Sequence, residues 1–282
     1  MHDELSSFVE RIQAEGKRLY RELPWRNIDD PYQVLVSEIM LQQTQVKRVL
    51  GYWDSFLALF PTLDALAAAE TSLVLEQWQG LGYNRRALSL QRAAQQCSRE
   101  YRGNMPQTYE ELLALPGVGP ATAAGVCAFA YNRPSVYIET NVRAVFIHEF
   151  FPQVQEVKDS QIYPLVEATC PQTNPRAWYY ALLDYGAHLK QHTVNPSRKS
   201  AHYSKQSAFE GSRRQKRAEI LRCVLGDPGI EENLLFEHLQ AFEAKAGRRT
   251  PHREEFDSII DDLVQEKFFN KEIHNGTIFF KA

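Results

Sequence analysis

Residues 115–125 read Leu-Pro-Gly-Val-Gly-Pro-Ala-Thr-Ala-Ala-Gly, and this stretch indicates the fold most directly. It lies between two short helical patterns, and Pro120 suits the first turn of the second one. Two glycines placed two residues apart let the backbone turn sharply and leave N–H groups exposed. The second helix then directs its N-terminus, the positive end of its dipole, outward. Such a hairpin of two helices can bind a phosphate without any charged side chain, whereas the two glycines alone also fit an ordinary glycine-rich connection.

Helical spacing continues along most of the chain. We expect helices over 5–22, 32–50, 52–59, 63–69, 72–79, 84–100, 108–115 and 120–131, separated by Pro, Gly or Asn. The helix over 108–115 begins with Thr108 and Glu111 at the spacing of a capping box. The expected fold class is therefore mostly α.

The C-terminal residues carry a different pattern. Three helices are expected over 213–226, 231–246 and 252–266, followed by β-prone runs at 268–274 and 277–281. Asn275-Gly276 joins the two runs, which is a strong signal for a β-hairpin. Three helices followed by a hairpin is the order of a winged helix. We therefore expect one helical domain over 1–212 and a small winged-helix-like α/β module over 213–282.

The composition excludes several classes of protein. The chain has 282 residues, 44% hydrophobic and 24% charged, as in an ordinary globular protein. Its apolar runs fall short of the ~18 to 20 residues that a membrane span needs, and the charged N-terminus does not resemble a secretion signal. The four cysteines are widely spaced and form no CxxC pair. We expect a soluble, cytoplasmic monomer that does not bind membranes and that is nucleoid-associated if bacterial.

The net charge of −3 conceals a strong asymmetry. Residues 190–217 carry +7, whereas residues 1–189 and 218–282 carry −5 each. The basic segment is also rich in Ser and poor in aliphatic residues, which is compatible with a solvated linker. It is equally compatible with a strand that lies along a phosphate backbone, because each neutralised phosphate releases counterions.

Glu38 is the only charge in the apolar run Tyr32–Leu41. On a helix its neighbours are Val34, Leu35 and Leu41, so burial is expected to raise its pKa toward neutrality. A carboxyl group of this kind can act as a general acid, although a glutamate at a helix edge with its head in water is common. The polar run Gln42-Gln43-Thr44-Gln45 follows directly and is typical of the mouth of a pocket.

Four stretches together resemble one family. In chain order they are LPWR (23–26), SEIMLQQTQV (37–46), GLGYNRRA (80–87) and LPGVGPATAAG (115–125). The chain resembles the helix-hairpin-helix DNA glycosylases over roughly residues 20–190, and most closely the adenine DNA glycosylases of the MutY type. The resemblance implies a two-lobed helical fold and a target base that is flipped into a pocket.

The resemblance also implies roles for individual residues. Glu38 matches the acid that protonates the adenine ring, and Asn141 an asparagine that holds the DNA backbone near a second carboxylate. The expected wall of the base pocket is Trp25, Arg26 and Asp184. The expected contacts with the duplex are Gln42, Gln43 and Tyr83, which match wedge residues, and the hairpin residues Gly117, Val118, Gly119 and Thr122.

Glu139 departs from the family pattern, which has Asp at this position. The family's Asp stabilises the cationic sugar or attacks it, in a pair of carboxylates around the glycosidic bond. Glu keeps the charge but is one methylene longer. We expect Glu139 to take over the role of the Asp.

Other positions bear on lyase activity and on the iron–sulfur cluster. Ala121 stands where bifunctional relatives have a lysine for Schiff-base chemistry, so the resemblance implies no lyase activity. The family's iron–sulfur cysteines match Lys190, Ser197, Ser200 and Gln206, which cannot ligate a cluster. We therefore expect neither a cluster nor another metal site, although a monovalent cation at the hairpin fits the family. The winged-helix-like module replaces the usual domain that recognises 8-oxoguanine.

The function predicted from these observations is that of a monofunctional DNA N-glycosylase in base excision repair. Its substrate would be adenine in mismatched or 8-oxoguanine-paired sites of double-stranded DNA. Two alternatives stay open: a glycosylase for uracil, thymine, hypoxanthine or an alkylated purine, and a non-catalytic DNA-binding protein built on the same scaffold. The partner of the C-terminal module is not indicated.

The basic segment yields a first prediction. Replacing Arg198, Lys199 and Lys205 by Gln should weaken DNA binding and flatten the dependence of log K on log salt, by up to about 0.9 for each phosphate that is no longer neutralised. Binding titrations at several salt concentrations measure this slope. An unchanged slope would mean that the segment is only a linker.

Overall fold

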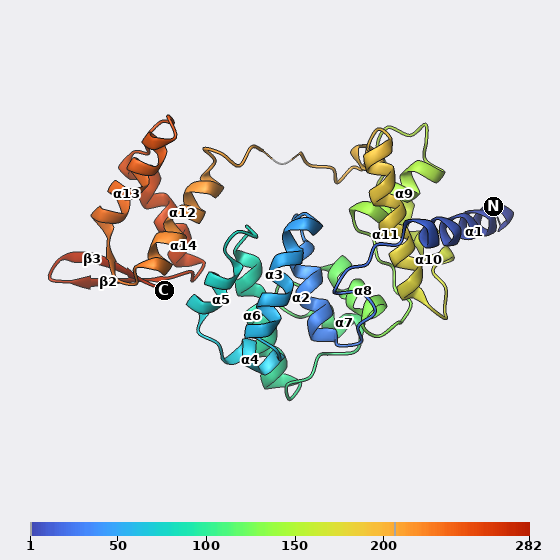
Figure 1. The fold of residues 1–282 in the computed structure, drawn as a ribbon, viewed down its shortest axis with the longest axis horizontal. Coiled ribbons are helices and arrows are strands. Elements are labelled where there is room, and N and C mark those ends of the chain that lie inside the picture. The colour runs from blue at the N-terminus through green and yellow to red at the C-terminus, as the bar shows by residue number, and fades with distance from the viewer. Residues whose placement is uncertain (1, 206) are drawn as a thin grey trace. The chain divides into compact units, whose positions relative to one another are not determined.

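The computed structural model describes residues 2–205 and 207–282, with His2 through its backbone alone. The chain forms two compact units (Figure 1). The first contains Met1–Trp53 and Arg99–Lys205, and the second contains Asp54–Ser98 and Gln206–Ala282. Among the described residues, no helix combines the length and the apolarity that crossing a bilayer requires.

The first unit consists of helices joined by short connections. They are α1 (His2–Leu19), α2 (Pro31–Leu41), the beginning of α3 (Val46–Leu59), α7 (Tyr109–Leu113), α8 (Pro120–Phe129), α9 (Thr140–Phe150), α10 (Asp159–Thr169), α11 (Pro175–His192) and the 3₁₀ helix η1 (Pro196–Lys199). Helix α11 packs against α1 and α9, and α2 packs against α8. The ring of Phe8 on α1 lies 5.2 Å from that of Phe146 on α9 and 6.0 Å from that of Trp178 on α11. These aromatic contacts hold the three helices together.

The second unit contains the remaining elements. They are the end of α3, α4 (Leu63–Ala68), α5 (Thr71–Trp78), α6 (Arg85–Glu100), α12 (Arg213–Gly226), β1 (Ile230–Glu231), α13 (Glu232–Lys245), α14 (Arg253–Gln265), β2 (Asn270–His274) and β3 (Thr277–Lys281). The predicted mostly helical fold is confirmed. The expected division at residue 212 stays a prediction. The compact units divide the chain after Lys205 instead, and the part that follows groups with residues 54–98.

The C-terminal part has the element order of a winged helix. The sheet order is β1-β3-β2, with all neighbours antiparallel, and Ile230 pairs with Phe280 while Ile273 pairs with Ile278. The turn residues Asn275 and Gly276 both have positive φ, 52° and 80°, as the Asn-Gly signal predicts. The short strand β1 was not expected from the sequence.

The helix predicted over 32–50 is wrong in one respect. Helix α2 ends at Leu41, and a turn separates it from α3, which then runs unbroken to Leu59. Gln43 takes a left-handed conformation with φ of 55°, which no helix continues through. The polar run 42–45 therefore forms a bend between two helices and not the surface of one.

Gly16 yields a prediction about stability. A Cβ at Gly16 on α1 would lie 2.3 Å from the Cβ of Ala181 on α11, so Gly16→Ala should force the helices apart. We expect a loss of about 1–2 kcal/mol, because overpacking exceeds the gain in helix propensity. Gly51→Ala is the matched control, since a Cβ there meets nothing within 4 Å. It should stabilise by about 0.5–1 kcal/mol. Urea unfolding measures both, and equal effects of the two changes would contradict the close crossing.

Candidate active site

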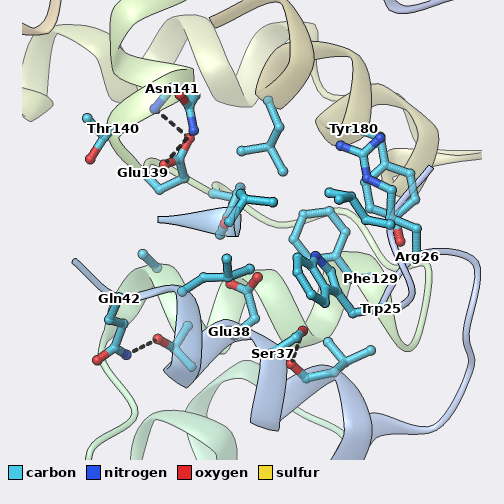
Figure 2. Close-up of a pocket in the computed structure, with 18 of the residues that line it drawn as sticks. Trp25, Arg26, Ser37, Glu38, Gln42, Phe129, Glu139, Thr140, Asn141 and Tyr180 are labelled. Atoms are coloured by element: carbon cyan, nitrogen blue, oxygen red, sulfur yellow. Dashed lines mark hydrogen bonds between the residues drawn. The ribbon is translucent and has the colours of Figure 1, made fainter. Parts of the chain in front are cut away.

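The first unit contains a cavity of about 250 Å³. Its walls come from α2, the turn after α2, α8, the segment before α9 and α11. The predicted residues that line it are Trp25, Arg26, Glu38, Gln42, Gln43, Thr122, Glu139 and Asn141. The two carboxyl groups reach the cavity from different elements, Glu38 from α2 and Glu139 from the residue before α9 (Figure 2).

Glu38 is enclosed by two close neighbours. A Cβ on Gly125 of α8 would lie 2.3 Å from Glu38 Oε2, so glycine at this position leaves room for the carboxyl group beside α8. The hydroxyl of Tyr137 donates a hydrogen bond to the carboxyl group. Burial raises the pKa of Glu38 to about 8, the charge of Glu139 adds to the increase, and the Tyr137 bond opposes it. At neutral pH the group therefore holds a proton that it can donate.

Glu139 is the N-cap of α9. Its Oε1 accepts hydrogen bonds from the backbone N–H groups of Asn141 and Val142, at 2.5 and 3.0 Å. Asn141 Nδ2 donates to Oε2 at 3.2 Å, while Asn141 Oδ1 is buried and has no partner among the described residues. Burial raises the pKa of Glu139 above its ordinary value, against the opposing effects of Lys190 and the two backbone bonds. The helix N-terminus thus supports a negative charge at this edge of the cavity.

The wall opposite the glutamates is held by an arginine–aspartate pair. Arg26 donates two hydrogen bonds of 2.8 Å to the oxygens of Asp184, and Arg21 Nε donates a third of 2.5 Å. The guanidinium of Arg26 lies 4.5 Å from the ring centroid of Tyr180. Asp184 itself does not line the cavity. Both of its carboxylate oxygens accept hydrogen bonds from Arg21 and Arg26. It therefore shapes the predicted base pocket through Arg26.

The turn after α2 is tied to the predicted hairpin. Gln42 Nε2 donates to Thr122 Oγ1 at 3.0 Å. Gly117 has a φ of 76°, which favours glycine, whereas Gly119 has an unrestricted φ of −94° and a Cβ there would meet no protein atom within 4 Å. The absence of a side chain at Gly119 leaves the N-terminus of α8 open. The amide of Val118 donates to Leu115 O at 3.1 Å, so it is engaged within the turn.

Tyr83 belongs to the second unit. It follows two glycines with positive φ, Gly80 and Gly82, and has itself a φ of 50°. Its side chain is exposed, and Arg214 Nη1 donates to its hydroxyl at 2.8 Å.

The basic segment is less open than its sequence suggests. Lys199 lies in η1 and its Nζ donates to Pro152 O at 2.6 Å, whereas Arg198 and Lys205 are exposed. Three further bases of the segment lie on α12 and form ion pairs, namely Arg213–Asp262, Lys216–Glu255 and Arg217–Glu266. The charge of +7 is therefore partly neutralised within the C-terminal module.

Of the residues that match the family's cluster ligands, three lie in the part of the chain that the structure describes. Asn195 Oδ1 accepts from the backbone N–H and the hydroxyl of Ser197, and both Ser197 and Ser200 are buried. Val157 and Ser200 form a parallel bridge that fixes the segment. Lys190 is half-buried near Glu139, and Gln206 lies outside the described residues. An ammonium and two hydroxyls do not suit an iron–sulfur cluster.

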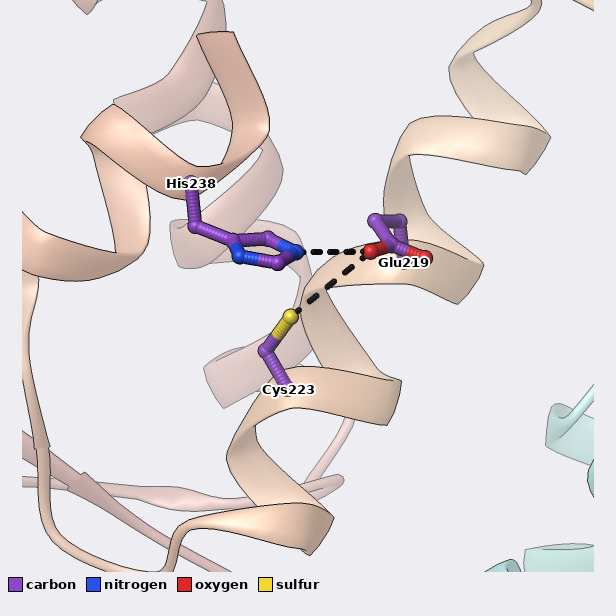
Figure 3. Close-up of side chains that lie close together, drawn as sticks. All are labelled: Glu219, Cys223 and His238. Atoms are coloured by element: carbon purple, nitrogen blue, oxygen red, sulfur yellow. Dashed lines mark hydrogen bonds and ion pairs between the residues drawn. The ribbon is translucent and has the colours of Figure 1, made fainter. Parts of the chain in front are cut away.

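One other group of side chains brings three metal-binding atom types together. Glu219 and Cys223 on α12 face His238 on α13 (Figure 3). The guanidinium Nη2 of Arg222 lies 2.5 Å from Glu219 Oε1, 3.5 Å from His238 Nε2 and 3.8 Å from Cys223 Sγ. A cationic group thus already occupies the position between the three donors. Burial also raises the pKa of Cys223 to about 11, which favours the thiol.

The sequence analysis missed three residues of this site. Tyr137 lies two residues before Glu139 on an extended segment, so their side chains share a side, and this alternation was the available signal. Nothing in the sequence around Gly125 indicated its contact with Glu38, because Glu38 lies 87 residues away in the chain. Gly186 on α11 was equally hidden: a Cβ there would lie 2.3 Å from Asn141 O, so glycine lets α11 support the start of α9.

Part of the chain is similar to known DNA repair proteins. Residues 36–169 match the HhH-GPD superfamily base excision DNA repair protein. The HhH-GPD segment contains both glutamates, the turn after α2 and the hairpin. The predicted resemblance to the helix-hairpin-helix DNA glycosylases is confirmed.

The chain is also similar to individual proteins. The chain is 45% identical over 135 residues to the adenine DNA glycosylase of Mycobacterium tuberculosis (strain CDC 1551 / Oshkosh), covering 48% of this chain and 44% of the relative. It is 38% identical over 169 residues to that of Mycolicibacterium smegmatis, covering 59% and 58%. The chain thus spans about half the length of these relatives. A solved structure of a thermostable thymine-DNA glycosylase is similar with a TM-score of 0.59 and 25% identity, over 66% of this chain and 87% of that one.

The pKa of Glu38 predicts how stability depends on pH. Its value of about 8 in the folded protein exceeds the ordinary 4.5, so the folded chain keeps a proton that the unfolded chain releases. The stability contributed by this group is complete below pH 4.5 and is lost as the pH rises to 8. Glu38→Gln should therefore become more stable than the wild type across this range, by on the order of 5 kcal/mol, and the difference should stay constant at higher pH.

Urea unfolding of both proteins at several pH values measures this difference. A difference that does not change with pH would show that Glu38 titrates alike in the folded and unfolded states.

Proposed function

We propose that this chain is a DNA glycosylase that excises adenine from mispaired sites in duplex DNA. The observation that carries the proposal is the pair of glutamates at one cavity, of which Glu38 holds a proton at neutral pH. The similarity of the chain to adenine DNA glycosylases supports the choice of base.

The two glutamates divide the chemistry between them. Glu38 donates its proton to a ring nitrogen of the flipped adenine, which makes the base a neutral leaving group. The glycosidic bond then breaks, and the deoxyribose carries positive charge. Glu139 balances that charge, and a water molecule adds to the sugar to complete the hydrolysis.

The hydrogen bonds that Glu139 accepts at the N-terminus of α9 support its proposed role in place of Asp. The carboxylate of Glu139 folds back onto the N–H groups of Asn141 and Val142, so the extra methylene does not let the group move freely. Lys190 further stabilises the ionised form. The proposed pair thus consists of one protonated carboxyl group and one whose ionised form is favoured by Lys190 and the backbone N–H groups, and the charge of Glu139 raises the pKa of Glu38.

The proposed enzyme is monofunctional. The described residues that line the cavity include Ala121 and no lysine, so the cavity offers no amine for a Schiff base. We further propose that it acts as a monomer and that Gly119 and Thr122 meet the phosphate backbone at the N-terminus of α8.

A second candidate is a glycosylase for another base. The likeness to a thymine-DNA glycosylase favours including thymine among the substrates tested. A panel of duplexes with A·G, A·8-oxoguanine, T·G, U·G and hypoxanthine pairs separates the candidates, and released base is detected as strand breakage after alkali.

Replacing Glu38 tests the mechanism. Glu38→Gln removes the proton donor and should lower single-turnover base release by about 10²–10⁴-fold. The affinity for the mispaired duplex should change less than threefold, since the amide fills the same space. Glu22→Gln, which removes a charge from an exposed side chain, is the control and should keep full activity.

Activity retained in Glu38→Gln would overturn the role assigned to Glu38. If the wild type bound these duplexes and released no base from any of them, the non-catalytic alternative would replace the proposal.

A further inference from the structure

The C-terminal module docks on α6 through one acidic residue. Glu266, the C-cap of α14, accepts two hydrogen bonds of 2.5 Å from Arg85 and one of 2.7 Å from Arg217. Arg92 of α6 also donates to the backbone carbonyl of Glu266 at 3.4 Å. The residues involved all belong to the second compact unit. Glu266 therefore links α12 of the module with the helix that follows the Tyr83 turn.

The turn before α6 is built around an exposed aromatic ring. Tyr83 has a φ of 50°, a conformation that bulky side chains rarely adopt. The preceding carbonyl, Gly82 O, accepts from Trp78 Nε1 at 3.2 Å and from Arg86 Nη2 at 2.8 Å. The backbone of the turn is thus fixed by α5 and α6, while the Tyr83 side chain stays exposed.

Arg214 of the module connects directly to this ring. Its Nη1 donates to Tyr83 Oη at 2.8 Å, and its guanidinium lies 5.6 Å from the ring centroid. Its Nη2 donates to Ser207 O at 2.7 Å. Arg214 therefore contacts Ser207, which precedes the module, through one nitrogen and Tyr83 through the other.

The charge distribution argues against the module reading DNA itself. Helix α14 has the position of a recognition helix, yet its residues include Glu254, Glu255, Asp257, Asp261 and Asp262. The bases of α12 that could meet phosphates are paired with acids of this helix, as in Arg213–Asp262 at 2.6 Å and Lys216–Glu255 at 2.5 Å. The module does contact α6 and Tyr83, and α12 also packs against α5.

We propose that the C-terminal module is a positioning element for Tyr83, and that Arg214 is the residue through which it acts. An exposed aromatic ring beside guanidinium groups is a surface on which a DNA base can stack. Holding the ring in one orientation before binding lowers the entropy that stacking would otherwise cost. This inference rests on the proposed function in that the ligand is duplex DNA.

Arg214→Ala tests the proposal. We expect the dissociation constant for a mispaired duplex to rise about 10-fold, while single-turnover base release at saturating DNA changes less than threefold. The fluorescence of 2-aminopurine beside the mispair, which reports unstacking, should rise less than with the wild type. Arg213→Ala is the matched control, because Arg213 contacts Ser258 and Asp262 within the module and not Tyr83. Arg214→Lys should restore part of the affinity, since it can still donate to the hydroxyl.

A second variant separates positioning from direct contact. In a Tyr83→Ala background, Arg214→Ala should have no further effect on affinity, and the salt dependence of binding should be the same with and without Arg214. An additive loss, or a slope lower by about 1, would show that Arg214 binds a phosphate itself and would overturn the proposal. Equal effects of Arg213→Ala and Arg214→Ala would also overturn it. These binding measurements do not require catalysis, so a failure of the proposed enzymatic function would be seen separately.

Discussion

The approach of the Glu38 carboxyl group to the backbone of Gly125 is the contact on which the site depends. Because Gly125 has no side chain, the Glu38 carboxyl group can occupy the space that a Cβ there would fill. The contact encloses the carboxyl group among protein atoms, while Tyr137 donates a hydrogen bond to it. Burial then raises the pKa of Glu38 to about 8 and keeps the acid protonated at neutral pH. The packing around Glu38 thus gives an ordinary glutamate a carboxyl group that can act as a general acid.

The opposite edge of the cavity is organised by a helix N-terminus. Glu139 caps α9 and accepts two backbone hydrogen bonds, which support its negative charge. Gly186 has no side chain, which lets α11 lie close to the backbone carbonyl of Asn141. This close packing supports the start of α9, where Glu139 is the N-cap. Two carboxyl groups with different environments result, one protonated by burial and one stabilised by the helix and by Lys190.

Much of the local structure could be predicted from the sequence, because it depends on neighbours in the chain. The capping box of Thr108 and Glu111, the positive φ values of Asn275 and Gly276, and most helix limits are of this kind. The break after Leu41 was missed, since the polar residues 42–45 carry no proline or glycine. Asp184 was placed in the pocket wall, yet the structure shows it bound to Arg21 and Arg26, which lie more than 150 residues earlier.

The sequence by itself determined which residues are candidates for the chemistry. The apolar run around Glu38, the two glycines of the hairpin and the second carboxylate are all visible in it, because residue type and spacing are local properties. Only the tertiary structure decided which charges stay available. It pairs Arg213, Lys216 and Arg217 with acids of α14, and it places Arg214 on Tyr83. The physical reason is that a charge acts over distances of a few ångströms in space, and folding alone determines which groups come that close.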